Sequence, residues 1–456
     1  MPQECRILRR CNVPTTGGPR GPHRAVGPGP YNSPMARALP PLFLLALIAA
    51  GVSCSGQDRP WTGEPPPEAG GWIEDQAGLW ALARNGQEAG IGSIGYAQGW
   101  EEAKDLLGVV TYEEGKAEEG GNLYSSGHGP EATLMDMRGE TLHTWKLNYA
   151  DIPDAPPLDD EHQNTWRRVR MLDDGSLVAI YGGRGLVRVD RDSRLIWHLG
   201  ERVHHDLVLL PSGQILTLGR RERLMETLNP RKPVIDDEVL WISADGQVEK
   251  RVSVLDALLQ SRWASDLRAL RPLAGDVLHV NTVEPILDPP PGAHPAFQAG
   301  RILCCARNPD WLFVLDPQTG RVEWLGRAGW RGPHDPRLLP SGRILLFDNL
   351  GASDPRRGPA SRVLEYDPLS ASITWQWQAD PPTGFFSLFC GAATRLGSGN
   401  TLVTETGNGR AFELEPGGRV VWDFHSPHRA GTDGALVAGL FEMQRVPLEK
   451  LKWMDR

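Results

Sequence analysis

Two segments of this sequence carry a histidine and an aspartate at the same distance before the same turn. HHDLVLLPSG begins at His204, and PHDPRLLPSG begins at Pro333. The Ser-Gly step is explained by folding, because such steps between apolar runs are typical of turns that connect strands. The histidines have no such explanation, and an imidazole can act near neutral pH as a nucleophile, an acid or base, or a metal ligand. His205 and His334 are therefore the first candidates for chemistry.

Three further polar residues extend this set. In the segment HVNTVE, His279 and Asn281 are two positions apart, so on a strand they project from the same face. Arg307 ends the apolar segment RILCCAR and could turn toward the same space. The set offers hydrogen-bond donors and titratable nitrogens without a carboxylate cluster, which suits an anionic group better than a cation. Three histidines could bind zinc, but the Asn and Arg beside them favour an anion, and we expect neither a metal nor a cofactor.

A repeated unit must position these residues. From Asn122 onward, a strand ending in an acid, a turn, and a second strand that usually closes on Trp recur in six copies. A strand pair around a Gly turn precedes each copy except the first, for which the C-terminal ALVAGLFEMQRV could supply the missing strand. Four antiparallel strands per unit, closed by pairing the two ends, predict an all-β, six-bladed β-propeller over residues 122–456. The recurring Trp is expected to pack between blades.

The repeats align the candidate residues with one another. Eight positions before the turn glycine stand Arg167, His205, His334 and Gly391, and a longer turn in the middle blade places Ser265 there. The innermost strand of a blade begins at the central channel, so these residues are expected to ring one mouth of it. Packing alone does not require basic or titratable side chains at this mouth, so the presence of Arg167, His205 and His334 there favours a functional role for them. The structural alternatives are a histidine at the start of a strand, a satisfied core histidine, or an arginine paired between blades.

These segments, namely HHD at 204–206, HVN at 279–281, Arg307 and HDPRLLPSGRILLFDN at 334–349, resemble the bacterial arylsulfotransferase family. The resemblance spans the propeller. It implies transfer of a sulfuryl group from a phenolic sulfate ester to a phenolic acceptor through a sulfated histidine, without a nucleotide sulfate donor.

The resemblance also implies a role for each residue. His334 would be the nucleophile, and His205 would bind sulfate or act as an acid or base. His279, Asn281 and Arg307 would hold the sulfuryl oxygens. Asp335 could orient His334, although adjacent residues on a strand point apart. The predicted substrate-binding residues are Asn281, Arg167 and His204, the last of which could take the place of His205.

Two other functions fit parts of the pattern. The blades also resemble those of quinoprotein dehydrogenases, where the adjacent Cys304 and Cys305 would form a vicinal disulfide over the quinone. The lack of a carboxylate-rich calcium site and the channel histidines argue against this. A non-catalytic envelope propeller that binds protein is the other alternative. The remaining histidines, His128 and His428 among them, fall in loops or outer strands and receive no role.

The N-terminal part predicts export. Residues 1–34 are basic and rich in Pro and Gly, and they read as a leader before a true start at Met35. Residues 35–54 resemble a signal peptide that ends in Gly-Val-Ser-Cys54, a sequence similar to a lipoprotein cleavage box. Gly51 stands where such a box prefers Leu, so we expect export, either to the periplasm or as an outer-membrane lipoprotein whose only membrane attachment would be a lipid on Cys54.

A linker (55–71) and an N-terminal extension (72–121), with a helix expected from Trp100 to Leu107, would connect this signal to the propeller. Lys and Arg total 48 against 57 Asp and Glu, a net charge of −9, which argues against nucleic acid as a partner. The six cysteines show no C-x-x-C spacing, so a structural zinc or redox motif has no support.

Overall fold

The computed structural model describes residues 101–158 and 163–455. All of them belong to one compact unit, Pro60–Arg456. The predicted leader, signal peptide, linker and Cys54 lie outside the described residues. No helix in the described part of the chain is long and apolar enough to cross a membrane.

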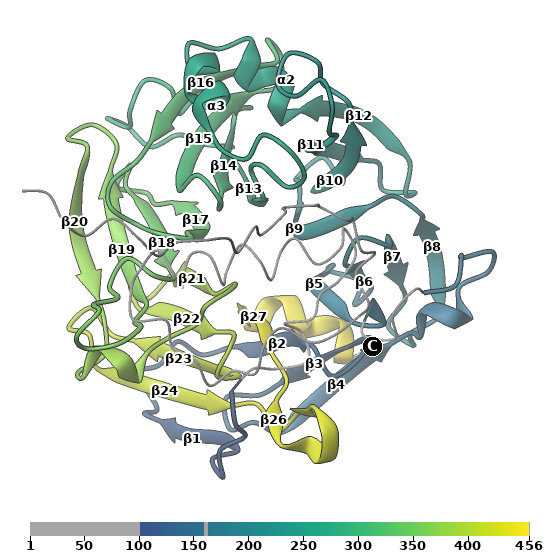
Figure 1. The fold of residues 1–456 in the computed structure, drawn as a ribbon. Coiled ribbons are helices and arrows are strands. Elements are labelled where there is room, and N and C mark those ends of the chain that lie inside the picture. Colours follow the sequence, from purple (N-terminus) through teal and green to yellow (C-terminus); the bar gives the residue numbers. More distant parts are fainter. Residues whose placement is uncertain (1–100, 159–162, 456) are drawn as a thin grey trace, which may run out of the picture. The chain divides into compact units, whose positions relative to one another are not determined.

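Six antiparallel sheets form the blades of a β-propeller around a common axis, which is called the channel below, and this confirms the predicted fold (Figure 1). The blades are numbered in chain order, and the innermost strand of each is given first. Blade 1 consists of β27 (Leu440–Val446), β2 (Gly121–Ser126), β3 (Glu131–Met135) and β4 (Thr141–Lys146). Blade 2 consists of β5 (Trp166–Met171), β6 (Leu177–Tyr181), β7 (Gly185–Val189) and β8 (Leu195–Leu199). Blade 3 consists of β9 (Val203–Leu209), β10 (Ile215–Arg223), β11 (Val234–Ile242) and β12 (Val248–Ser253).

Blades 4 to 6 follow the same plan. Blade 4 consists of β13 (Val280–Pro285), β14 (Ile302–Ala306), β15 (Trp311–Asp316) and β16 (Arg321–Gly326). Blade 5 consists of β17 (His334–Leu338), β18 (Ile344–Asp348), β19 (Arg362–Asp367) and β20 (Ser372–Trp377). Blade 6 consists of β21 (Ala392–Arg395), β22 (Thr401–Glu405), β23 (Arg410–Leu414) and β24 (Val420–His425). Short elements lie between blades: the helices α2 (Val254–Leu259) and α3 (Ala264–Ala269), the 3-10 helices Tyr149–Asp151, Pro382–Gly384, Thr432–Gly434 and Leu448–Asp455, and the strands β25 (Arg429–Ala430) and β26 (Leu436–Val437).

The two ends of the propeller chain pair in blade 1. β27 from the C-terminus lies against β2, with Gly121 opposite Val446 and Ser126 opposite Leu440. This is the closure that the sequence predicted for ALVAGLFEMQRV. It places residues of the C-terminal segment beside those that begin the propeller.

The segment before blade 1 differs from the prediction. Residues 101–107 form no helix, and β1 (Gly108–Tyr112) pairs with β24 as a fifth, outermost strand of blade 6. The short GVVTY run alternates too weakly for its strand character to be read without knowing its partner. Tertiary pairing decides its conformation.

Tryptophans tie four of the blades to the next one; three of them, Trp145, Trp197 and Trp422, are recurring residues of the predicted pattern, and in blade 5 Trp377 takes the place of the predicted Trp375. The indole N–H groups of Trp145, Trp197, Trp377 and Trp422 donate to backbone carbonyls in turns of the following blade, at 2.9–3.0 Å. Trp422 of blade 6 donates to Met137 in blade 1, which continues the pattern across the closure. A packed indole needs a partner for its N–H, and in these four cases a turn of the following blade provides one.

Candidate active site

The innermost strands are irregular where they begin at the channel. β5 pairs Trp166 and Arg168 with consecutive residues of β6, so Arg167 lies in a bulge, and Asn281 lies in a similar bulge of β13. β9 and β17 also lose register at their His-Asp pairs. A bulge turns a side chain away from the regular alternation of a strand. These irregularities carry polar side chains into the channel mouth.

Two of the channel histidines have a left-handed backbone. His205 has φ 57° and His279 has φ 52°. Such values are uncommon outside glycine, and strained backbone of this kind gathers at functional sites. The imidazoles of His205 and His279 contact each other in a row of hydrogen-bonded side chains.

Three histidines and an aspartate form that row. His204 Nδ1 lies 2.7 Å from His205 Nδ1, His205 Nε2 lies 3.1 Å from His279 Nε2, and His279 Nδ1 lies 2.6 Å from Asp276 Oδ2. At the other end, His204 Nε2 lies 3.2 Å from the carbonyl oxygen of Gly219. All three imidazoles are buried, so their hydrogen bonds fix where the protons lie.

The proton positions follow from the Gly219 carbonyl, which can only accept. His204 therefore carries its proton on Nε2, and its Nδ1 accepts from His205 Nδ1–H. His205 Nε2 then accepts from His279 Nε2–H, so His279 Nδ1 shares a second proton with Asp276. We infer that His279 is an imidazolium held by the Asp276 carboxylate, with one N–H directed at His205.

The surroundings agree with this assignment. Burial, with the nearby charge of His279, lowers the pKa of His205 well below its ordinary value, so His205 is neutral. Burial and nearby cationic groups likewise keep His204 neutral by lowering its pKa. Burial alone would raise the pKa of Asp276, but the charge and hydrogen bond of His279 lower it. The row thus ends in the His279–Asp276 ion pair on one side, and on the other side His204 Nε2 lies 3.2 Å from Asp237 Oδ1 as well as from the Gly219 carbonyl.

His334 lies apart from this row and is held differently. Its Nδ1 lies 2.9 Å from the Gly332 carbonyl and 2.8 Å from Asn349 Oδ1. Both partners accept, so the proton is on Nδ1 and the lone pair is on Nε2. Within the described residues, Nε2 has no hydrogen bond. Burial, followed by the charge of Arg307, lowers the pKa of His334 well below its ordinary value, and the imidazole is neutral.

Asn349 is itself fixed by the backbone. Its Nδ2 donates to the carbonyls of Ser387 at 2.7 Å and Cys390 at 2.6 Å, which orients its Oδ1 toward His334. A second residue supports the same segment: Asn281 Nδ2 donates to the carbonyl of Pro333 at 2.9 Å. The His334 imidazole is therefore oriented by a residue of its own blade, and the backbone before it is held from blade 4.

Two arginines supply positive charge at the mouth. Arg307 is 1% exposed, follows β14, and stacks over the Phe389 ring at 5.0 Å. Arg167 stacks over Phe441 at 4.7 Å and donates to the Cys390 sulfur at 3.1 Å. Their charges reach the histidines, because Arg307 lowers the pKa of His334 and Arg167 contributes to the lowered pKa of His205.

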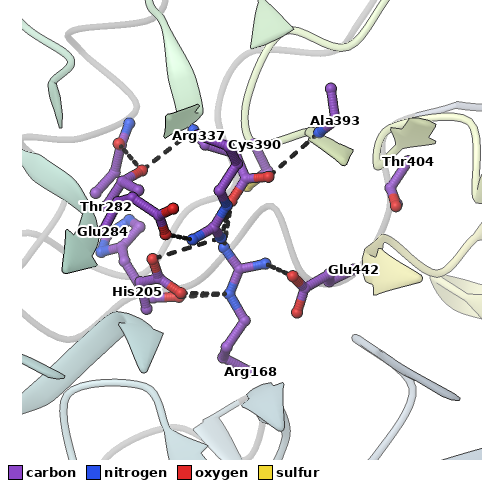
Figure 2. Close-up of polar contacts among 12 residues, drawn as sticks. Arg168, His205, Thr282, Glu284, Arg337, Cys390, Ala393, Thr404 and Glu442 are labelled. Atoms are coloured by element: carbon purple, nitrogen blue, oxygen red, sulfur yellow. Dashed lines mark hydrogen bonds and ion pairs between the residues drawn. The ribbon is translucent and has the colours of Figure 1, made fainter. Parts of the chain in front are cut away.

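A layer of ion pairs lies next to the histidines in the same channel (Figure 2). Arg168 contacts Asp206 at 3.2 Å, Asp335 at 3.3 Å and Glu442 at 2.9 Å, and it donates to the His205 carbonyl at 3.2 Å. Arg337 contacts Asp335 and lies 2.8 Å from Glu284. Arg170 pairs with Glu442 as well. These charges come from the innermost strands of blades 1 to 5 and join the blades at the axis.

The aspartates of the two His-Asp pairs have one shared task. Asp206 Oδ2 accepts from the backbone N–H of Val283 in blade 4, and Asp335 Oδ2 accepts from that of Ala393 in blade 6, each at 3.2 Å. Each carboxylate thus fastens its blade to the next. Asp335 does not contact His334; Asn349 performs the orienting role considered for it.

The sequence placed most of these residues, with one error. Ser265 is exposed on α3 and does not line the channel, because the inserted helices α2 and α3 lengthen blade 4 and its innermost strand begins only at Val280. His204 faces Gly219 behind His205, so His205 is the channel histidine. Sequence reasoning missed Asp276 and Asn349, although Asp276 stands three residues before His279.

Cys304 and Cys305 form no vicinal disulfide. Both are buried free thiols on β14 and point to opposite sides, with Cys304 in an apolar cluster and the Cys305 sulfur 3.0 Å from the Pro333 carbonyl. The feature that suggested a quinoprotein is therefore absent from blade 4.

Comparison with known families bears on this arrangement. The family description Arylsulfotransferase (ASST) matches residues 168–427, more than half of the chain. The chain belongs to the arylsulfotransferase family. Membership marks it as a transferase, and the matched region contains every histidine of the channel mouth.

Solved structures similar to this arylsulfotransferase family member include three propeller-length matches. A protein of unknown function from Bacteroides caccae is 13% identical with a TM-score of 0.45, and the match covers 70% of this chain and 98% of that one. A streptogramin B lyase is 11% identical (TM-score 0.42; 76% and 97% covered). A catalytically inactive variant of virginiamycin B lyase from Staphylococcus aureus is 9% identical (TM-score 0.38; 71% and 89%). A search of curated proteins gave no match.

Proposed function

We propose that this protein transfers a sulfuryl group from a phenolic sulfate ester to a phenolic acceptor through a sulfated His334. The observation that carries the proposal is the state of His334: a neutral imidazole whose Nδ1–H is held by Gly332 and Asn349 and whose Nε2 lone pair is left for attack. Nucleophilic histidine needs this tautomer, because the attacking nitrogen must be unprotonated.

In the first step, His334 Nε2 forms a bond to sulfur while the bond from sulfur to the phenolic oxygen breaks. The leaving oxygen takes the proton of His279 Nε2, which now hydrogen-bonds to His205. The products are a free phenol, a neutral His279 and an N-sulfo imidazole at His334. Protonation by a positioned acid accelerates departure of a phenolate.

In the second step, the acceptor phenol gives its proton to His279 Nε2 and its oxygen attacks sulfur. The bond between sulfur and His334 Nε2 breaks, which returns His334 to its neutral form and His279 to its imidazolium form. The Asp276 carboxylate stays charged throughout and favours protonated His279. Each step therefore leaves the site ready for the other.

The negative oxygens of the transferring group would be met by the cationic side of the mouth. Arg307 near His334 and Arg167 near His205 are fixed by stacking on Phe389 and Phe441. Preorganised positive groups in a water-poor site stabilise charge that develops in a transition state more strongly than groups in water. As in phosphoryl transfer, positioning and charge stabilisation would supply most of the rate.

The test is p-nitrophenol release from p-nitrophenyl sulfate by the purified protein, with and without phenol. We expect release that depends on phenol and disappears in His334→Ala. His294→Ala, a histidine in a blade 4 loop, serves as the matched control. Release by His334→Ala at the wild-type rate, or no release from any of several aryl sulfates by correctly folded protein, would overturn the proposal and favour a binding propeller.

A further inference from the structure

A second histidine cluster lies outside the channel, in the closing region of the propeller. His128 stands in the turn between β2 and β3, Glu131 begins β3, and His428 lies between β24 and β25. The two imidazoles stack in parallel, with ring centroids 3.4 Å apart and planes 8° apart. His128 Nε2 lies 2.8 Å from Glu131 Oε1. Residues from both ends of the propeller chain thus meet at one point.

We propose that His128, Glu131 and His428 form a binding site for a divalent transition metal, with zinc as the expected ion. Two imidazoles and one carboxylate are a donor set that zinc accepts, with a fourth position left for water or another ligand. One donor atom from each residue lies within 4.8 Å of the others. The two rings are stacked and the lone pair of an imidazole lies in its ring plane, so at least one ring must turn about its side-chain bonds for both to bind one ion.

The partners of the imidazoles suit metal binding. His128 Nδ1 contacts Ser126 Oγ at 2.5 Å, so the hydroxyl can hold a proton on Nδ1, and an ion would replace the Nε2 proton that His128 now donates to Glu131 Oε1. His428 Nε2 lies 3.2 Å from the hydroxyl of buried Tyr124, which can accept its proton and leave Nδ1. Fixing the tautomer through the second ring nitrogen is how proteins orient metal-binding histidines.

The charge at this site is also favourable. The Glu131 carboxylate, which accepts from His128 Nε2, is the anionic ligand that the site offers a cation. The nearest competing cation is the exposed Lys146, whose Nζ lies 3.5 Å from Glu131 Oε2.

The position of the site gives it a structural consequence. Glu131 and His128 belong to the first blade, while His428 precedes β27, the strand that closes the same blade from the C-terminus. An ion bound by all three would cross-link the closure, and binding to the folded state alone raises stability. The ion would lie at the end of the propeller that carries Arg307, because His128 and Arg307 occupy corresponding turns of blades 1 and 4.

The experiment is titration of the chelator-treated full chain with zinc chloride by calorimetry, with visible absorption of bound Co²⁺ as a second measurement. We expect one zinc per chain, a rise in Tm with zinc, loss of that site in His428→Ala, and binding at least about tenfold weaker in Glu131→Gln. Lys146→Ala should tighten binding several-fold, because it removes the competing cation. His294→Ala is the control.

The channel histidines are the other place where zinc could bind, and the variants separate the two. Zinc binding that survives in Glu131→Gln and His428→Ala but is lost in His279→Ala would overturn the proposal. A wild-type chain that takes up no zinc at micromolar concentration would overturn it too. If His428→Ala does not fold by circular dichroism, Glu131→Gln and Lys146→Ala decide, since their opposite expected effects cannot both come from misfolding.

Discussion

The channel contains two layers that differ in purpose although they are built from adjacent residues. His205, His334 and Arg167 belong to the histidine layer, and the next residue of each, Asp206, Asp335 and Arg168, belongs to the ion-pair layer. In the histidine layer, hydrogen bonds leave a lone pair on His334 and a proton on His279. In the ion-pair layer, the acids and arginines satisfy one another and join five blades (Figure 2). In each repeated His-Asp pair, the histidine (His205 or His334) belongs to the site of the proposed reaction, whereas the aspartate (Asp206 or Asp335) joins neighbouring blades.

This division predicts that substitutions in the two layers have separable effects. The largest effect belongs to His334→Ala, which should lower turnover by roughly 10³-fold or more because no other lone pair replaces the nucleophile. The free energy of unfolding should fall by only about 1–2 kcal/mol, because the substitution leaves a small cavity and two unpaired acceptors but no unpaired buried charge in the ion-pair layer. Rates and urea unfolding measured on one preparation test both statements. A variant that unfolds easily yet keeps its turnover would reverse the roles of the layers.

The ion-pair layer is tested by Glu442→Gln. Burial would raise the pKa of Glu442, but Arg168 and Arg170 lower it to about 2. A carboxyl whose pKa is depressed in the folded state stabilises the protein above its unfolded value of about 4.3, and this contribution disappears as the pH falls toward 2.

We therefore expect Glu442→Gln to lose about 3 kcal/mol of unfolding free energy at pH 7 and to show a weaker loss of stability from about pH 4.5 downward than wild type. Unfolding curves at several pH values provide the measurement. Equal acid sensitivity of the two proteins would mean that Glu442 is not held by the arginines.

Within the histidine layer, Asp276→Asn should lower turnover by about 10²-fold, because the neutral amide no longer favours protonated His279. The loss should be smaller at low pH. The Asp276 carboxylate, whose own pKa is lowered by His279, stabilises the proton on that imidazole. Without it, the alkaline limb of the pH–rate profile should move to lower pH. A uniform loss at every pH would indicate a purely structural role for Asp276.

The smallest effect is expected for Asn349→Ala, a positioning residue that acts through His334. Its Oδ1 shares the His334 proton with the Gly332 carbonyl, which remains in the variant. We expect kcat to fall about tenfold while KM changes little, in line with the loss of one orienting partner. A change confined to KM would show that Asn349 contacts substrate instead.

Much of the fold could be predicted, because the blades repeat the same strands and turns, five of six copies close on Trp, and the C-terminal segment supplies the strand that the first copy lacks. The two predictions about the fold that were wrong have physical causes. Ser265 was misplaced because two short helices enter blade 4, and β1 was missed because its strand character depends on pairing with β24.

The site was predicted only in part for a related reason. The repeat count placed Arg167, His205 and His334 because all three stand where innermost strands begin. Asn349 reaches His334 across a turn, and His128 meets His428 only after the ring closes, so no spacing along the chain reveals either contact. Periodicity predicts elements, whereas contacts between blades require the structure.

The most direct test of the central claim is mass spectrometry of the protein after incubation with p-nitrophenyl sulfate in the absence of an acceptor, under non-acidic conditions. We expect one added sulfuryl group on the peptide that contains His334, its removal on addition of phenol, and its absence in His334→Ala. A sulfuryl group on His205 or His279, or turnover without any protein-bound sulfuryl group, would contradict the account.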